Sequence, residues 1–186
     1  MKIIGFIGID GGVEMVLKGD SCLLNNRKPF FIPEEDAQIR MTPCIVLRVS
    51  RLGKHIAPKF AGRYYDAVAH GADFADERLL ERARETGGSW TRAIAFDYSL
   101  AVGEMMSKEE GIDASLEFPV AGFKLQEDQT PQIESPVISP EDAIARASEV
   151  MTLRQGDLIY IHQINGSRIV HEEEVIEAEG LYCKVK

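Results

Sequence analysis

The stretch KIIGFIGIDGGVEMVLK (residues 2–18) decides between two kinds of protein. Its Asp-Gly-Gly sequence at residues 10–12 is either a phosphate loop of a kinase-like nucleotide enzyme or the turn between two strands. Glycine adopts positive φ without steric cost, which suits the turn of a hairpin. A phosphate loop of this kind also needs a hydroxyl residue soon after the glycines, whereas Glu14 stands there and would repel phosphate. The stretch therefore predicts a β-hairpin.

Length and charge narrow the class of protein further. The chain has 186 residues, 45% of them apolar, which suits one compact domain over residues 1–186 and is short for a two-domain kinase. Its net charge of −9, from 21 basic and 30 acidic residues, argues against a nucleic-acid partner. No apolar segment is long enough to suggest a membrane span, and the first residues lack the pattern of a signal peptide. Cys22, Cys44 and Cys183 form no CxxC pair and indicate reduced thiols in a cytoplasmic protein.

Strand patterns dominate the chain. Runs rich in β-branched residues are typical of strands. They occur at residues 2–9, 13–18, 42–50, 156–164 and 172–186. Residues 107–136 carry three prolines and show no clear pattern.

Helix patterns are fewer. The strongest covers residues 139–151, where Ser139 can cap the helix and Pro140 takes its first position. A second helix is predicted over residues 75–88, which end in two glycines, and a third over residues 58–70, opening at Pro58. About seven to nine strands and two or three helices, without regular alternation, indicate an α+β fold that is mainly β.

Five spaced segments carry a family resemblance. They are KPFFIP (28–33), IVLRVSRLGKHIAP (45–58), YYDAVAHGADF (64–74), SWTRAIAFDYS (89–99) and SPEDAIARASEVMTLRQGDLIY (139–160). In this order they resemble the fumarylacetoacetate hydrolase family, from about residue 13 to the end of the chain. The resemblance implies a mixed β-sandwich roll of the type of that family's C-terminal domain, and usually a dimer. Family members hydrolyse β-diketone C–C bonds, decarboxylate oxaloacetate-like acids or isomerise, and all use a divalent cation.

The resemblance also implies where a metal site would be. The family holds Mg²⁺ or Mn²⁺ with a Glu-x-Glu pair on one strand and an Asp on another, because residues i and i+2 share a strand face. Here Thr42 and Cys44 occupy the two Glu positions, and only the Asp survives, as Asp73. Ile94 stands at the position of the family's lysine. No bound metal is therefore expected, and Mg²⁺ or Mn²⁺ only if the family site is retained.

Other family positions are partly kept. Lys18 matches the lysine that precedes the core sheet, and Asp97 matches an aspartate of the WTRAIAFD segment. Residues 162–165 replace a Thr-Gly-Thr-Pro loop. The N-terminal strand and hairpin, residues 1–18, stand in place of the family's lid, which carries a His and a Glu. These six positions (Lys18, Thr42, Cys44, Asp73, Ile94 and Asp97) would form a vestigial pocket, with no confident catalytic residue.

Two functional hypotheses remain open at this point. In the first, the chain is catalytically degenerate, and binds a small carboxylate or acts as a partner subunit, as a homodimer or a heterodimer with a paralogue. In the second, it is an active hydrolase, decarboxylase or isomerase of β-diketo or 2-oxo acids with an altered metal site. Ligands for such a site would be Cys44, His70 and Asp73, or acids such as Glu104. Simpler interpretations make Cys44 a small buried residue, and Asp73 a cap of the helix beginning near Asp76 or the partner of a base.

Overall fold

The computed structural model describes residues 1–9, 11–108, 136–164 and 166–186. The chain begins with the predicted hairpin, in which β1 (Ile3–Ile9) pairs antiparallel with β2 (Gly12–Lys18). Gly11 has a φ of 93°, the left-handed conformation that such a turn requires and that glycine adopts without strain. Residue 10 lies outside the described residues. Among the described helices, none is long and apolar enough to cross a membrane.

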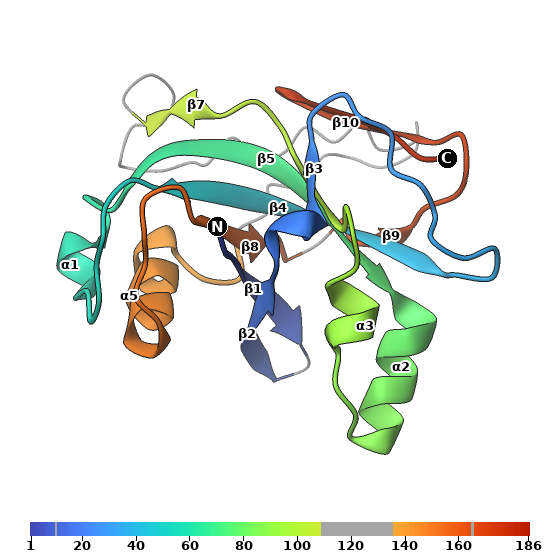
Figure 1. The fold of residues 1–186 in the computed structure, drawn as a ribbon, viewed down its shortest axis with the longest axis horizontal. Helices are drawn as coiled ribbons and strands as arrows, with labels where there is room; N and C mark the ends of the chain where they lie inside the picture. Colours follow the sequence, from blue (N-terminus) through green and yellow to red (C-terminus); the bar gives the residue numbers. More distant parts are fainter. Residues whose placement is uncertain (10, 109–135, 165) are drawn as a thin grey trace.

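A single mixed sheet of nine strands forms the body of the molecule (Figure 1). Its main path runs in the order β2-β1-β8-β4-β5-β6-β3, with β7 and β9 pairing beside β5 and β4. The remaining strands of this sheet are β3 (Leu23–Asn25), β4 (Ile39–Val49), β5 (Tyr65–Asp76), β6 (Leu100–Val102), β7 (Met106–Ser107), β8 (Leu158–His162) and β9 (Arg168–Ile169). The long β4 and β5 pair antiparallel along nearly their whole length, so they form the centre of the sheet.

The sheet curls into a roll because its two edge strands are neighbours in the chain. A single short connection, which holds the 3-10 helix Asp20–Cys22, joins β2 at one edge to β3 at the other. One face of the sheet consequently lies inside the roll. A buried cluster there draws side chains from five strands: Ile3, Cys44, Ala69, Leu100 and Tyr160 are members. Alternation along each strand fixes which residues point inward.

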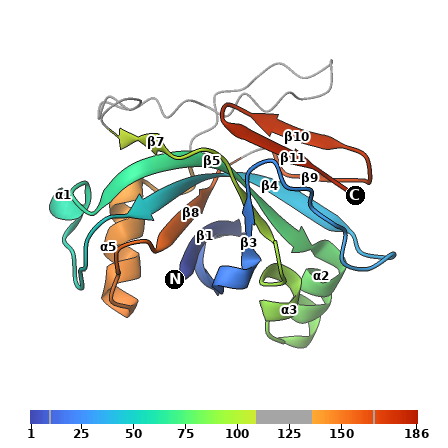
Figure 2. The ribbon, with the colours of Figure 1, turned by 45° about the horizontal axis from the view of Figure 1, so that its top comes forward.

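Two covers protect the outer face of the sheet. Helix α5 (Pro140–Val150) places Ala143, Ile144 and Ala147 in a cluster with residues of β4 and β8. The hairpin of β10 (Val175–Ala178) and β11 (Leu181–Lys184) covers the opposite end of β4 and β5, where Phe30 stacks on Phe74 with ring centroids 4.0 Å apart. Figure 2 shows these two covers at opposite ends of the long strands.

Two further helices close one end of the roll. These are α2 (Glu77–Thr86), which follows directly after β5, and the single turn α3 (Thr91–Ile94). Leu80 and Ile94 pack with Ala75 and Val16 at this end. Helices α2 and α3 therefore close the end where β5 terminates. At the open end, where β5 begins, lie the one-turn α1 (Pro58–Ala61), helix α5 and β7 (Figure 1).

The mainly β, α+β prediction is confirmed, and so are the helices near residues 75–88 and 139–151. Ser139 caps α5 by accepting a hydrogen bond from Asp142 N, and Gly87 ends α2 in the left-handed conformation. The predicted helix over residues 58–70 is wrong. It stops after one turn at Gly62. The residues from Tyr65 onward form β5, because they pair with β4 on one side and, at Ala67 and Val68, with β7 on the other. Four α-helices are described in all, and most of the unpatterned 107–136 segment lies outside the described residues.

Candidate functional site

An ammonium–carboxylate pair lies inside the sealed end of the roll. Lys18 is the last residue of β2, and its Nζ lies 2.5 Å from Oδ1 of Asp73 on β5. The Lys18 side chain is 0% exposed and that of Asp73 is 4% exposed. Burying two charges is unfavourable unless they are paired and their remaining hydrogen-bonding groups are satisfied. The pair therefore depends on its neighbours.

Those neighbours satisfy both charged groups. Lys18 Nζ also donates to the carbonyl oxygen of Ser99 at 2.9 Å and contacts the Ser99 hydroxyl at 3.0 Å. That hydroxyl in turn donates to the carbonyl of Ile94 at 3.1 Å. The second oxygen of Asp73 accepts a hydrogen bond from Nε2 of His162 at 2.8 Å. These contacts form an unbroken chain of hydrogen bonds. We call the four residues that it joins the ionic cluster: Lys18, Asp73, Ser99 and His162.

Tyr160 forms one wall of the ionic cluster. Lys18 Nζ lies 5.6 Å from the centroid of its ring, a distance at which a cation is attracted to the ring face. The ring can lie there because the facing residue on β1 is Gly5, where an added Cβ would come within 2.2 Å of Tyr160 Cζ. The glycine in the first strand thus makes room for the tyrosine beside the buried charge.

Thr42 and Cys44 lie next to Asp73 across the strands. Thr42 pairs with Asp73 in the β4–β5 register, and Cys44 pairs with Gly71 on one side and His162 on the other. The Thr42 hydroxyl lies 3.0 Å from the Ser167 hydroxyl, while Cys44 is fully buried. Both side chains share the inner face with Asp73, so the structure brings together four of the six positions assigned from the sequence, including Lys18.

The other assigned positions lie apart from this cluster. Ile94 is buried among apolar side chains of α2 and α3, and only its backbone carbonyl meets the ionic cluster, through Ser99. Asp97 is exposed in a turn. Glu104 is 65% exposed and lies 3.9 Å from Arg27. A shared pocket that includes the side chains of Ile94 and Asp97 is therefore not formed.

The alternative metal ligands do not assemble either. His70 and Asp73 are three residues apart on one regular strand, so their side chains point to opposite faces of the sheet. His70 is buried on the outer face, and Cys44 and Asp73 are on the inner one. Within the described part of the chain, no group of three or more His, Cys, Asp or Glu side chains is arranged to hold a metal ion.

Electrostatics set the protonation state of the ionic cluster. Burial by itself raises the pKa of the Asp73 carboxyl, but the Lys18 ammonium and the His162 hydrogen bond outweigh it and hold that pKa below its ordinary value of 3.8. Burial, reinforced by the charge of Asp73, raises the pKa of the Cys44 thiol well above its ordinary value. Asp73 is thus a carboxylate at neutral pH, and Cys44 a neutral thiol.

Sequence reasoning missed two members of the ionic cluster, His162 and Ser99, as well as Tyr160. His162 ends β8, within the strand predicted over residues 156–164, but the resemblance gave it no role beyond the start of a replaced loop. The alternation LIYIH places Tyr160 and His162 on one face, and this pattern was the available signal. The helix interpretation of Asp73 is also wrong, because Asp76 caps α2 by accepting from Leu79 N and Asp73 pairs with a base.

The fold and the site together define a rolled β-sheet protein with a buried ionic centre on its inner face. The chain belongs to the fumarylacetoacetate hydrolase family: the family model described as fumarylacetoacetate (FAA) hydrolase C-terminal matches residues 10–181. The predicted family resemblance and roll fold are confirmed. No curated protein sequence matches the chain significantly.

Solved structures share the fold over the whole chain. A candidate fumarylpyruvate hydrolase from Burkholderia cenocepacia superposes with a TM-score of 0.81 at 16% identity, covering 100% of this chain and 88% of that one. A fumarylpyruvate hydrolase from Pseudomonas aeruginosa, in complex with Mn²⁺ and pyruvate, gives 0.79 at 17% identity, covering 99% and 88%. A 2-hydroxyhepta-2,4-diene-1,7-dioate isomerase from Mycobacterium marinum gives 0.74 at 18%, covering 99% and 73%. Such low identities establish the fold alone.

The residues of this chain do not fit the family's divalent cation. Hard cations such as Mg²⁺ take several oxygen ligands, mainly carboxylates. Both oxygens of Asp73 are already engaged by Lys18 and His162, and its nearest inner-face neighbours are a neutral hydroxyl and a neutral thiol. The site therefore offers a divalent cation no set of free oxygen ligands.

The ionic cluster makes the stability of the protein sensitive to acid. A carboxyl group with a lowered pKa in the folded state stabilises that state above its unfolded pKa, and the contribution is lost as the pH falls through the folded pKa. We expect the contribution of Asp73 to the free energy of unfolding to be constant above about pH 5 and to decline below about pH 4. Urea denaturation between pH 2.5 and 7 measures it.

Other carboxyl groups contribute to acid sensitivity as well, so the comparison that isolates Asp73 is between wild type and Asp73→Asn. Asp66 and Asp157 also have lowered pKa values, and they remain in both proteins. The difference in stability between the two proteins should shrink below about pH 4. Parallel profiles over the whole range would show that Asp73 does not titrate as the geometry implies.

Proposed function

We propose that this chain is a family member in which Lys18 and His162 occupy both oxygens of Asp73, the one cation ligand that the resemblance retains, and that it acts by binding a ligand or partner subunit. One observation carries the proposal: both carboxylate oxygens of Asp73 are occupied by groups of the chain itself. The ammonium balances the charge that a cation would otherwise balance. The chain then keeps the family roll without the Lewis acid that the family's chemistry uses.

Charge repulsion supports this proposal. Two unit charges 4 Å apart interact by about 4 kcal/mol at an effective dielectric constant of 20, and a dication doubles this to about 8 kcal/mol. A divalent cation beside Asp73 would meet the buried Lys18 ammonium at short range. It would have to expel Lys18 from a network in which the Nζ group also contacts Ser99. Metal binding at this position therefore competes with the fold's own ion pair.

The N-terminal hairpin is part of the core of the roll. Ile3, Ile4 and Phe6 of β1 are buried in the core, and β1 pairs with β8 as well as with β2. An element so deeply packed holds the roll together, and it does not open and close as a lid does. On this proposal, the acid–base residues that the family carries on its lid have no counterpart in the hairpin.

Binding and assembly are the remaining roles. A small carboxylate and a second subunit, either a copy of this chain or a paralogue, are the proposed partners. Size-exclusion chromatography with light scattering tests the dimer directly. A strictly monomeric protein over micromolar concentrations would remove the homodimer from the proposal.

A second candidate is an active hydrolase, decarboxylase or isomerase of β-diketo or 2-oxo acids with an altered metal site. The similarity to the Pseudomonas aeruginosa fumarylpyruvate hydrolase, whose structure contains Mn²⁺ and pyruvate, favours this candidate. Asp73, which the chain retains, would then be a ligand after Lys18 moved away from it. This candidate requires the ion pair to break on metal binding.

Metal titration separates the two candidates. We expect 5 mM Mg²⁺ or Mn²⁺ to leave the melting temperature within about 1 °C of the value in EDTA, because a ligand stabilises the folded state only when it binds that state. For comparison, a metal ion that binds the folded state and is present at 100 times its dissociation constant would raise the free energy of unfolding by about 2.7 kcal/mol. We also expect no metal-stimulated turnover of acylpyruvates or oxaloacetate.

If metal-stimulated turnover is observed, two variants show whether Asp73 holds the metal. Asp73→Ala removes the candidate ligand, and Asp97→Asn changes an exposed carboxylate outside the ionic cluster. Turnover that needs Mn²⁺, survives Asp97→Asn and disappears in Asp73→Ala would overturn the proposal and establish the enzyme. Bound metal measured by elemental analysis at near-stoichiometric levels would do the same.

A further inference from the structure

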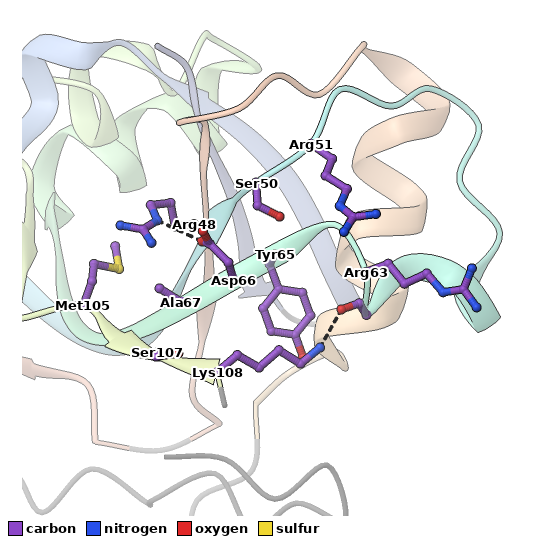
Figure 3. Close-up of a pocket in the computed structure, with 11 residues that line it drawn as sticks. Arg48, Ser50, Arg51, Arg63, Tyr65, Asp66, Ala67, Met105, Ser107 and Lys108 are labelled. Atoms are coloured by element: carbon purple, nitrogen blue, oxygen red, sulfur yellow. Dashed lines mark hydrogen bonds and ion pairs between the residues drawn. The ribbon is translucent and has the colours of Figure 1, made fainter. Parts of the chain in front are cut away.

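A second polar site lies at the open end of the roll, away from the ionic cluster. A cavity of about 1010 Å³ is lined there by residues from the end of β4, the segment after it, the start of β5 and β7. Figure 3 shows side chains from these separate segments around one hollow, among them Arg48, Arg51, Tyr65 and Lys108. Its volume suits a small organic ligand.

The charge of this cavity is opposite to that of the whole protein. Four cationic residues line it: Arg48, Arg51, Arg63 and Lys108. The side chain of Arg63 extends away from the hollow, toward Phe60 (Figure 3). Asp66 is the single carboxylate among the lining residues. The chain as a whole has a net charge of −9, so gathering four cations in one hollow runs against its composition. A concave surface lined by charges of one sign focuses the potential and attracts counter-ions.

Two of these cationic side chains have hydrogen-bond or ion-pair partners within the protein, and the other two have none among the described residues. Lys108 Nζ donates to the carbonyl of Gly62 at 2.6 Å and lies 3.9 Å from the centroid of the Tyr65 ring. Arg48 pairs with Asp66 at 2.9 Å, but both side chains are nearly half exposed, and such surface pairs contribute little. Among the described residues, the Arg51 side chain makes no hydrogen bond or ion pair, and that of Arg63 contacts only the ring of Phe60.

We propose that this cavity binds a small anion that carries at least two carboxylate or phosphate groups. Arg51 has an unpaired guanidinium group, whose planar donors match carboxylate and phosphate oxygens in pairs. Arg63 adds positive charge at the edge of the cavity. Lys108 adds a fixed positive charge, and the neighbouring Ser50 adds a hydroxyl donor. One carboxylate or phosphate group would leave part of this charge unbalanced, which is why the ligand class has at least two.

The proposed anion site is independent of the ionic cluster. Cys44 and Arg48 share the inner face of β4, four residues apart, which separates them by about 13 Å along the strand. Val46 and Ala69 pack between the two sites in the apolar cluster. An anion at Arg51 therefore does not touch Asp73, and the proposal stands whether or not the chain is an enzyme.

Calorimetric titration of the full chain with citrate and with pyrophosphate tests the proposal and distinguishes the two sources of the anion. We expect at least one probe to bind with a submillimolar dissociation constant. Arg51→Gln should weaken it about tenfold, as expected for losing a charge-assisted hydrogen bond, and Arg63→Gln, which removes a charge at the edge of the cavity, should weaken it less. Arg51→Lys, which keeps the charge and loses the paired donors, should weaken it less. Raising NaCl from 50 to 500 mM should weaken it in the wild type.

Arg82→Gln is the matched control, because Arg82 is an exposed arginine on α2 at the other end of the roll. It should change the dissociation constant less than twofold. Arg51 and Arg63 are exposed, so their variants are expected to fold, and melting curves verify this. The proposal is overturned if neither probe binds, if binding persists in the Arg51→Gln/Arg63→Gln double variant, or if Arg82→Gln weakens binding as much as the cavity variants do.

Discussion

Asp73→Asn is expected to lower the free energy of unfolding by about 3–5 kcal/mol, the range for breaking a buried ion pair by removing one partner. The substitution keeps the size of the side chain and removes its charge. Lys18 would then remain as an ammonium with a fully buried side chain and no counter-charge within the ionic cluster. Urea denaturation followed by circular dichroism at pH 7 measures the change.

The double variant Lys18→Met/Asp73→Asn shows whether the cause is the unpaired charge. Methionine has nearly the volume of lysine and leaves no ammonium in the apolar interior. Replacing both members of a buried ion pair is often close to neutral, so the double variant should be more stable than Asp73→Asn alone. If the double variant is less stable than the wild type by the sum of the two single-variant effects, the two residues do not interact as the 2.5 Å contact implies.

Gly5→Ala is expected to destabilise the protein by about 1–3 kcal/mol or more through overpacking. The added Cβ would lie 2.2 Å from Cζ and 2.4 Å from Oη of Tyr160. The Tyr160 side chain is 0% exposed, so its ring cannot swing into solvent. Relief requires β1 to move away from β8 or the ring to move toward Lys18, and either change disturbs the ionic cluster. Thermal and urea denaturation report the loss.

Two further variants test this explanation of Gly5. Gly19→Ala is the matched control, since a Cβ at that position meets no atom within 4 Å. It should change the stability by less than about 0.5 kcal/mol. In a Tyr160→Leu background, the Gly5→Ala substitution should cost clearly less than in the wild type, because the ring that it strikes is gone. An equal cost in both backgrounds would mean that the strand itself, and not Tyr160, requires the glycine.

Local patterns predicted those elements whose formation depends on neighbours in sequence. The hairpin of residues 2–18 follows from a glycine turn between two β-type runs. Helix α5 follows from the Ser139 cap, the proline after it and an apolar stripe. Capping and turn geometry are decided within four or five residues, so the sequence contains the whole cause.

The region from residue 58 to residue 70 shows where local patterns fail. A proline that opens a helix and the alanines after it favour a helix by propensity, yet all but one turn of this segment is loop or strand. In β5 these residues pair with β4, and Ala67 and Val68 also pair with β7. Burial in the sheet outweighs a propensity of a few tenths of a kcal/mol per residue. The gain comes from partners that are distant in sequence.

The family, the mainly β roll and the hairpin at its start follow from the sequence alone. The partners of Asp73 follow only from the way the chain folds. Lys18 meets Asp73 across 55 residues of chain, and His162 meets it across 89. Those meetings depend on closing the roll and on the register of each strand, in which a shift of one residue would turn the side chain to the other face. No local pattern records such a register, because it is fixed by the packing of the whole sheet.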